Sequence, residues 1–196
     1  MTLRIVHRIV RIVLIAIPVL VMCWLIAQHF AFSGVLNITN DFSRPSPFIK
    51  GLWPPGRVEP VMYDTMTNDY IQRMLIDPVT FRVQLPRAFD AMTLSLRYAK
   101  EDAQPFRVGI RTVPEQWSWE LHNLTTMRDA DGWNTGTVRF DHLKRYAGEG
   151  KVVDVLLNAP DLVNHTPIVL TDIRVVAERE PMTWSNVWGR VFRFII

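Results

Sequence analysis

Apolar and polar residues alternate with a period of two through most of residues 70–180, the pattern of a β-strand that buries one face. Seven runs separated by turn residues are predicted as strands: Thr80–Leu85, Ala91–Tyr98, Pro105–Val113, Trp117–His122, Thr137–Asp141, Val152–Leu157 and Ile168–Ala177. All of them alternate except Val152–Leu157, which is nearly continuously apolar. In the last run the apolar phase changes between Leu170 and Ile173, which predicts a β-bulge near Thr171 and Asp172. The fold class predicted is therefore mostly β, an antiparallel β-sandwich over residues 70–180.

A long apolar segment precedes this domain at residues 12–32. It begins with 16 uncharged residues, Ile12 to Ala27, and continues through Gln28 and His29 to Phe32. A helix of these 21 residues is roughly 31 Å long, which matches the hydrocarbon core of a bilayer. The segment predicts a single-pass transmembrane helix that acts as a signal-anchor. A cleaved signal peptide is the alternative, because Ala31-Phe32-Ser33 offers small residues at cleavage positions.

Charge gives the expected orientation of this helix. Arg4, Arg8 and Arg11 lie in the tail of residues 1–11, and no acidic residue occurs before Asp41. By the positive-inside rule, the N-terminus is cytoplasmic and the C-terminal domain is extracytoplasmic, at the cell membrane.

The C-terminal residues 181–196 follow a helical period instead. Apolar residues recur there at intervals of three and four: Trp184, Val187, Trp188, Val191, Phe192 and Ile195. Arg190 and Arg193 lie on the other side, so the segment predicts a basic amphipathic helix in a membrane interface. A helix packed on the sandwich, or a final strand at Arg190–Ile195, is the alternative. The residues expected to contact membrane lipid are Arg4, Arg8, Arg11, Trp184, Trp188, Arg190 and Arg193.

Residues 33–69 are rich in proline and have no regular pattern. They contain Pro45, Pro47, Pro54, Pro55 and Pro60. Proline favours extended chain, so the segment is either a stiff spacer or a strap along the edge of the domain. Its apolar residues, among them Phe48, Ile49 and Leu52, favour the strap.

The overall charge of +3 comes from the N-terminal tail. Without Arg4, Arg8 and Arg11, the 22 basic residues become 19, which equals the 19 acidic residues. A charge-balanced domain gives no support for nucleic-acid binding. The single cysteine, Cys23, lies in the apolar segment, so the domain is expected to fold without a disulfide.

Two stretches of the sandwich resemble galactose-binding-like jelly rolls, the fold of many carbohydrate-binding modules. DGWNTGTVRFD (Asp131–Asp141) is similar to the loop and strand that precede a central strand in those modules. KVVDVLLNAP (Lys151–Pro160), followed by IVLTDIRVV (Ile168–Val176), resembles their last two strands. The resemblance covers about Ile71–Glu178, implies a jelly-roll-like sandwich that binds carbohydrate, and transfers no signature residue for a particular sugar.

Sugar binding requires an aromatic face beside hydrogen-bonding groups. Trp133, in a loop with Asn134 and Asp131, is the best candidate ligand-binding set. Trp53 and Tyr63 are further options, while Trp117 and Trp119 share one strand face and are more typical of a core. Asp129, Asp131 and Asn134 also resemble the start of a calcium loop, but the later ligands are missing and Asp131-Gly132 is a common hairpin turn.

No catalytic motif is recognisable. Glu120 and His122 share a strand face, and His142 follows two strands later, but a polar sheet face commonly produces such a set. No metal site or cofactor is predicted. Three Asn-x-Ser/Thr sequences, at Asn37, Asn123 and Asn164, matter only in a host that glycosylates exported asparagine.

The sequence therefore predicts a membrane-anchored, non-catalytic β-sandwich that binds or organises cell-envelope carbohydrate. The alternative is a structural subunit of a membrane complex. Partners expected are membrane lipid together with surface polysaccharide or other membrane proteins.

Overall fold

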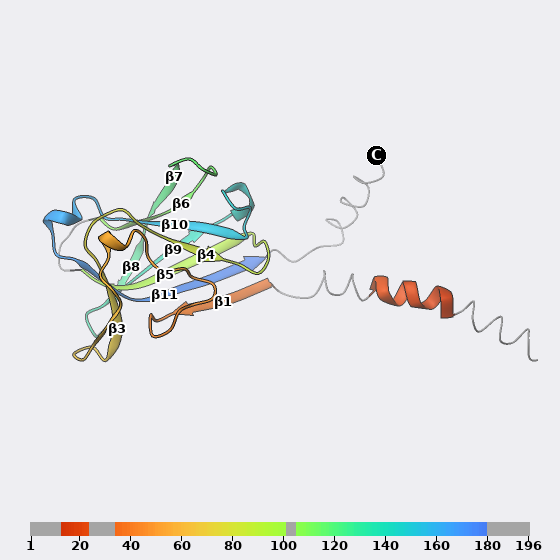
Figure 1. Ribbon diagram of the computed structural model, residues 1–196, viewed down its shortest axis with the longest axis horizontal. Helices are drawn as coiled ribbons and strands as arrows, with labels where there is room; N and C mark the ends of the chain where they lie inside the picture. The colour runs from red at the N-terminus through yellow and green to blue at the C-terminus, as the bar shows by residue number, and fades with distance from the viewer. Residues whose placement is uncertain (1–12, 24–33, 101–104, 180–196) are drawn as a thin grey trace, which may run out of the picture. The chain divides into compact units, whose positions relative to one another are not determined.

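The computed structural model describes residues 13–23, 34–100 and 105–179. The chain divides into two units, and the larger one, Gly34–Glu180, is a β-sandwich (Figure 1). Its strands are β1 (Gly34–Asn40), β2 (Met62–Asp64), β3 (Asp69–Met74), β4 (Val79–Gln84), β5 (Ala91–Ala99), β6 (Arg107–Arg111), β7 (Trp119–Asn123), β8 (Thr125–Arg128), β9 (Asn134–Phe140), β10 (Val152–Asn158) and β11 (Ile168–Arg179). Short 3-10 turns occur at η1 (Pro55–Arg57), η2 (Leu143–Arg145) and η3 (Leu162–Asn164).

The strands form two antiparallel sheets. The seven-stranded sheet has the order β2-β3-β11-β5-β9-β8, with β1 also paired to β11. The four-stranded sheet has the order β4-β10-β6-β7. All seven predicted strands are present, so the prediction of an antiparallel sandwich is confirmed.

Strand β11 organises the larger sheet because three other strands pair with it. One edge of β11 pairs with β5. Its other edge pairs with β3 at Ile168–Leu170 and with β1 from Ile173 onward. The register shifts between Leu170 and Asp172, which confirms the predicted bulge. The bulge lies where one edge partner ends and the other begins.

The core lies between the two sheets and is built from the apolar member of each alternating pair. Leu94 and Leu96 of β5 and Ile173 of β11 are fully buried, as are Val83 of β4 and Val155 of β10. Burial of large aliphatic side chains contributes roughly 1.5–3 kcal/mol each. Tight packing of these side chains therefore holds the sheets together without a disulfide in this unit.

The proline-rich segment lies against the domain, as the strap interpretation expected, and it also supplies strands. Ile49 and Trp53 form bridges to β4, and Val58 forms a bridge to β3. Ile49 and Leu52 are buried in the core. The boundary expected at Tyr70 therefore lies inside the compact unit, which begins at Gly34.

In the other unit, residues 13–23 form a helix whose large apolar side chains are exposed. Among the described residues, no helix is both long enough and apolar enough to cross a membrane. The rest of the predicted transmembrane segment, residue 12 and residues 24–32, lies outside the described residues, as do the N-terminal tail and the predicted C-terminal helix. Those predictions stay predictions.

Candidate functional site

The residues predicted to bind sugar gather around Arg97 on the seven-stranded sheet. Trp133 is only 9% exposed, and the Arg97 guanidinium carbon lies 5.3 Å from the centre of its ring. Asp131 pairs with the same guanidinium at 3.5 Å, and Asn134 lies in β9, paired with Tyr98 and Arg128. Trp133 therefore offers no open face for stacking. The expectation of an exposed Trp133 platform is corrected, because the cation covers the ring.

The acidic residues of this loop are also engaged within the protein. Asp129 accepts a hydrogen bond from the Thr135 hydroxyl at 3.2 Å and pairs with Arg97 at 3.5 Å. The turn itself is closed by the Gly132 amide, which donates to the Asp129 carbonyl at 3.0 Å, and Gly132 has a φ of 83°. These contacts explain the Asp-Gly sequence as a hairpin turn. No group of three or more potential metal ligands gathers among the described residues.

A polar groove of about 570 Å³ crosses the seven-stranded sheet beside this loop. Its charged lining residues are Asp41, Asp69, Arg97, Asp129, Asp172 and Arg174. Burial raises the pKa of Asp172, and the hydrogen bond from Arg174 opposes that shift. No tryptophan lines this groove, so it lacks the aromatic surface that sugar stacking requires.

Another groove lies on the outer face of the four-stranded sheet, and tryptophan side chains give it an aromatic surface. Its volume is about 420 Å³. It is lined by Lys50, Gly51, Trp53, Thr80, Phe81, Arg82, Arg111, Trp117 and Asp154. Trp53 and Trp117 are 61% and 64% exposed. We refer to it as the tryptophan groove.

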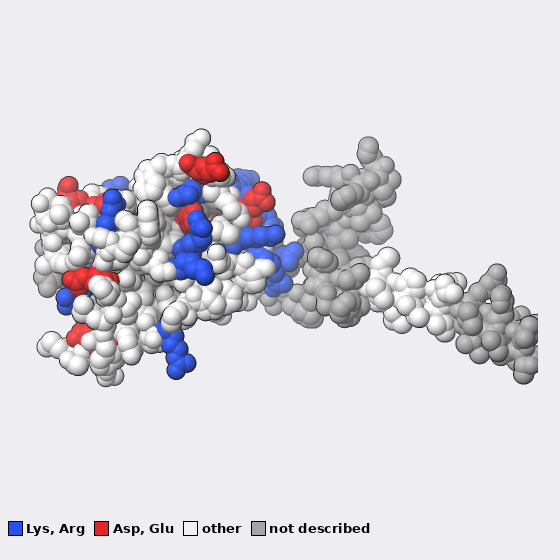
Figure 2. Space-filling model, in the orientation of Figure 1, with Lys and Arg blue, Asp and Glu red and all other residues white. Residues whose placement is uncertain are grey.

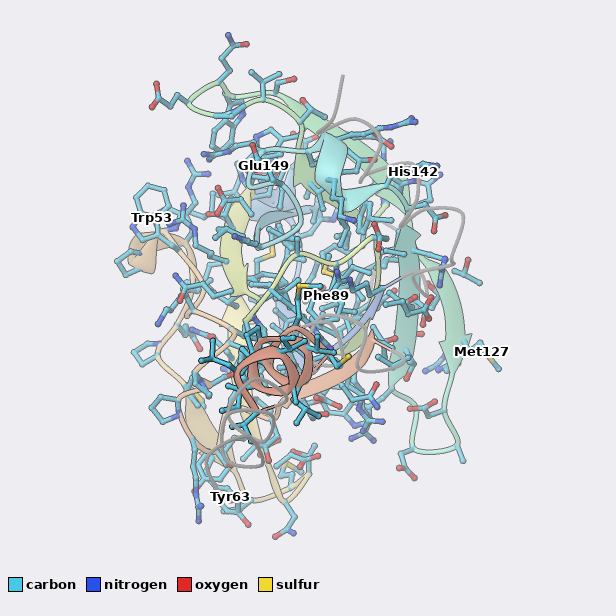
Figure 3. All side chains as sticks on the ribbon, turned by 90° about the vertical axis from the view of Figure 1, so that its right-hand side faces the viewer. Trp53, Tyr63, Phe89, Met127, His142 and Glu149 are labelled. Atoms are coloured by element: carbon cyan, nitrogen blue, oxygen red, sulfur yellow. The ribbon has the colours of Figure 1, made fainter. Side chains whose placement is uncertain are left out.

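The backbone of the strap holds Trp53 in place. Its amide donates to the Thr80 carbonyl at 2.8 Å, and the Thr80 amide donates back to the Trp53 carbonyl at 2.8 Å. Leu52, the residue before Trp53, is buried in the core. Because successive side chains of an extended chain point to opposite sides, Trp53 points outward. Trp53 accordingly lies at the edge of the molecule in Figure 3, whereas buried Phe89 lies at its centre.

Trp117 and Trp119 lie on the outer face, which corrects the expectation that they belong to the core. Directly paired residues of antiparallel strands point to the same side of a sheet. Trp119 pairs with outward Arg111, whereas Glu120 pairs with Ile110, which is fully buried. The pairing with β6 therefore places Trp119 on the outer face, and Trp117 beside it is 64% exposed.

The loop before β7 is closed by hydrogen bonds that position Trp117. The Thr112 amide donates to the Ser118 carbonyl at 2.9 Å, and the Thr112 hydroxyl donates to Ser118 Oγ at 2.7 Å. The rings of Trp117 and Trp119 meet edge to face with 5.3 Å between their centres. The Arg111 guanidinium in turn lies 5.1 Å from the Trp119 ring centre.

A row of charged side chains forms the floor of the tryptophan groove. Arg82 Nε donates to Asp154 Oδ1 at 2.6 Å, and Arg82 Nη2 donates to Oδ2 at 3.3 Å. Arg111 Nη1 lies 3.2 Å from the same Oδ2. The hydrogen bond and charge of Asp154 raise the pKa of Arg82 above its usual value. Asp154 therefore fixes both guanidinium groups beside the tryptophans.

The histidine and glutamate considered for acid–base chemistry lie outside both grooves. His122 Nε2 is 2.8 Å from Glu120 Oε1, and the Tyr146 hydroxyl donates to Glu120 Oε2 at 3.0 Å. The hydrogen bond with His122 is the main cause that lowers the pKa of Glu120. Burial, followed by Glu120, raises the pKa of Tyr146 to about 12. The cluster crosses from β7 to the loop after η2, and none of its three residues lines either groove.

The chain was compared with protein families, curated proteins and solved structures, and only the solved structures gave matches. No protein-family model matches the sequence, and no curated protein matches it either. Among solved structures, the CBM22-1 xylan-binding domain of Xyn10C from Paenibacillus barcinonensis has a TM-score of 0.51 at 8% identity, over 76% of this chain and 99% of that domain. This chain has the same β-sandwich fold.

Two further carbohydrate-binding modules are more distant in structure. A CBM27 described for specific mannan recognition gives a TM-score of 0.45 at 15% identity, over 74% of this chain and 99% of that one. CsCBM6-3 from Clostridium stercorarium, in complex with cellobiose, gives 0.41 at 9% identity, over 74% and 94%.

Proposed function

We propose that this protein is a non-catalytic polysaccharide-binding protein whose ligand occupies the tryptophan groove. The observation that carries the proposal is the pair of tryptophans, Trp53 and Trp117, which stand more than half exposed beside hydrogen-bonding groups. Large exposed aromatic residues on a monomer commonly mark a binding site. The carbohydrate-binding-module fold supports a sugar as the ligand.

The groove provides both parts of a sugar-binding site. An indole face packs against the C–H groups of a pyranose ring, while the guanidinium and ammonium groups donate hydrogen bonds to its oxygens. Because Asp154 already holds the two guanidinium groups and the strap holds Trp53, little ordering of these residues is needed on binding, which favours affinity. The lining of the groove holds one carboxylate, Asp154, which pairs with two arginines, whereas cleavage of a glycosidic bond commonly uses two carboxyl groups; the groove therefore suits binding.

Glycan-array binding by the purified full chain, followed by calorimetric titration of each hit, tests this function. Trp53→Ala and Trp117→Ala should each weaken binding roughly tenfold, since hot-spot aromatics contribute 1.4 kcal/mol or more. Tyr63→Ala is the matched control, because Tyr63 is 49% exposed but lies on β2, away from the groove. Absence of binding to every glycan, or equal loss with the control, would refute the proposal.

We also propose that the sandwich is anchored in the cell membrane by residues 12–32 and lies outside the cytoplasm. The apolar, uncharged sequence of that segment supports this, as does the basic tail before it. Gly34 pairs directly with Arg179, so both flanking sequences are attached to the same end of the sandwich. This arrangement suits a domain whose two ends both meet the bilayer.

Protease treatment of intact cells tests the anchor, with an epitope tag at the C-terminus and the outer face accessible. The tag should be digested while the N-terminal tail stays protected. Protection of the tag together with loss of the N-terminus would reverse the topology, and release of the protein by alkaline carbonate would argue against an anchor.

A specific surface feature supports a second candidate function, that of a structural subunit. The hairpin of β2 and β3 exposes Met62, Tyr63, Met66 and Tyr70, and Met66 is 94% exposed. Exposed apolar groups close together commonly contact another protein. A photo-crosslinker at Met66 should capture one specific membrane protein if this function holds, and no adduct if it does not.

A further inference from the structure

The tryptophan groove carries a surplus of positive charge. Its ionisable lining residues are Lys50, Arg82, Arg111 and Asp154. Three cations and one carboxylate leave two positive charges in the groove. Figure 2 shows Lys and Arg side chains gathered in a band over the middle of one face of the sandwich. Without Arg4, Arg8 and Arg11, the 19 basic residues of the chain equal its 19 acidic residues, so the surplus is a local feature of the groove.

The groove is also rich in hydrogen-bond donors and poor in free acceptors. Asp154 is the only carboxylate in its lining, its side chain is only 15% exposed, and two arginines already occupy both of its oxygens. Arg82 is 50% exposed and engages Asp154 through Nε and Nη2, which leaves donors on Nη1. Among the described residues, the Lys50 ammonium has no ion-pair partner, and the buried Nε of Arg111 has no hydrogen-bond partner.

The positions of these donors match a ligand that stacks on Trp53. The Lys50 amide donates to the Arg82 carbonyl at 2.8 Å, so the side chains of these two cations are attached to neighbouring positions of the backbone. Trp53 pairs with Thr80, which precedes Arg82 by two residues on the same side of β4. Two residues of strand span about 7 Å. A ring on Trp53 thus has its substituents within reach of the Arg82 guanidinium.

From this placement we propose that the ligand of the tryptophan groove is an anionic polysaccharide. Carboxylate or sulfate groups on the sugar rings accept from Arg82 and Lys50, while the rings stack on the tryptophans. The Nη1 donors that Asp154 leaves free on Arg82 can make charge-assisted hydrogen bonds to such an oxyanion. This inference rests on the proposed function of the groove as a sugar-binding site, and it adds the charge of the sugar.

The test compares polymers that differ only in charge, titrated into the full chain in a non-ionic detergent. A polyuronate is compared with the same polymer after reduction of its carboxyl groups to alcohols, and dextran sulfate is compared with dextran. We expect the charged member of at least one pair to bind about tenfold more tightly, and to lose that advantage between about 50 and about 500 mM NaCl. The pair that shows the difference identifies carboxylate or sulfate as the anion.

Variants of single cations assign the effect to the groove. Lys50→Gln and Arg82→Gln should each weaken binding of the charged polymer by about three- to tenfold, with the neutral polymer unchanged. Arg128→Gln is the matched control, since Arg128 is an exposed cation of β8 on the other sheet. Its neighbour Met127 lies on the opposite side of the molecule from Trp53 in Figure 3.

The outcomes separate this inference from the proposed function. Equal or tighter binding of the neutral polymers, lost with Trp53→Ala, would overturn the charge preference and leave polysaccharide binding intact. Charged binding that survives Lys50→Gln and Arg82→Gln, or falls equally with Arg128→Gln, would place the effect outside the groove and overturn the inference. Failure of every polymer to bind would overturn both.

Discussion

Replacement of the buried and exposed tryptophans by alanine should separate stability from binding. Trp133 is 9% exposed, whereas Trp53 is 61% and Trp117 is 64% exposed. Trp133→Ala should destabilise the domain strongly and leave groove binding unchanged. Trp53→Ala and Trp117→Ala should do the reverse, because their rings contact mainly solvent.

The size of the difference follows from the exposed fractions. Trp133 buries 52 percentage points more of its side chain than Trp53, which is 61% less 9%. For a residue of about 250 Å², that fraction is about 130 Å², worth about 3 kcal/mol at roughly 25 cal/mol per Å². Loss of the Arg97 contact with the ring adds about 1 kcal/mol. Trp133→Ala should therefore lower the free energy of unfolding by about 3–4 kcal/mol more than Trp53→Ala does.

Guanidinium denaturation of the Gly34–Glu180 fragment measures this difference. Far-UV circular dichroism is the suitable signal, because it does not depend on the tryptophan fluorescence that the variants change. Destabilisation by Trp53→Ala or Trp117→Ala equal to that by Trp133→Ala would refute the reasoning. A Trp133→Ala variant that is folded but no longer binds the glycan would also refute the reasoning, because it would place the binding site at the loop beside Arg97.

Three further predictions concern packing, pH and the domain boundary. Gly109→Ala should lower the free energy of unfolding of the fragment, measured in denaturant, by about 1–3 kcal/mol. A Cβ at this position would lie 2.8 Å from Leu121 Cδ2 and 3.0 Å from the Glu120 carbonyl oxygen. Unchanged stability would show that β7 can shift. Since burial raises the pKa of Asp172, the stability that its carboxyl contributes is lost as pH rises through the folded pKa. Asp172→Asn should then gain stability relative to the native chain as pH rises above the ordinary aspartate pKa of 3.8, and a difference that stays constant over that rise would contradict the assignment. Circular dichroism should show that a fragment starting at Tyr70 is unfolded and that one starting at Gly34 is folded. The reason is that β1 pairs with β11 and that Ile49 and Leu52 are buried in the core. Two folded fragments would support the domain boundary at Tyr70.

The sequence predicted the architecture well because apolar alternation follows directly from burial. Leu94 and Leu96 on β5, and the phase change at Thr171, lie where the pattern placed them. Strand β8 was missed because all its residues are exposed, so Thr125–Arg128 show no alternation. Strand β1 was missed because it adjoins the proline-rich segment and its sequence GVLNITN is short and mixed.

The site could not be found from alternation alone. Trp119 and Leu121 have the spacing of core residues, and only the register with Arg111 and Gly109 turns them outward. Trp53 lies in a segment without a pattern, and its position depends on hydrogen bonds to Thr80 across the strap. Arg97 covers Trp133 from a strand that is distant in sequence. The contacts of Trp53 with Thr80 and of Arg97 with Trp133 join residues far apart in the chain, so no local signal in the sequence reports them.

The central claim is that the ligand lies between Trp53 and Trp117. Nitrogen-15 NMR of the Gly34–Glu180 fragment tests it directly, because Trp53, Trp117, Trp119 and Trp133 each give one indole N–H signal. During titration with a binding polysaccharide, the signals of Trp53 and Trp117 should shift while that of Trp133 stays in place. A shift of Trp133 with Trp53 and Trp117 unchanged would contradict the account.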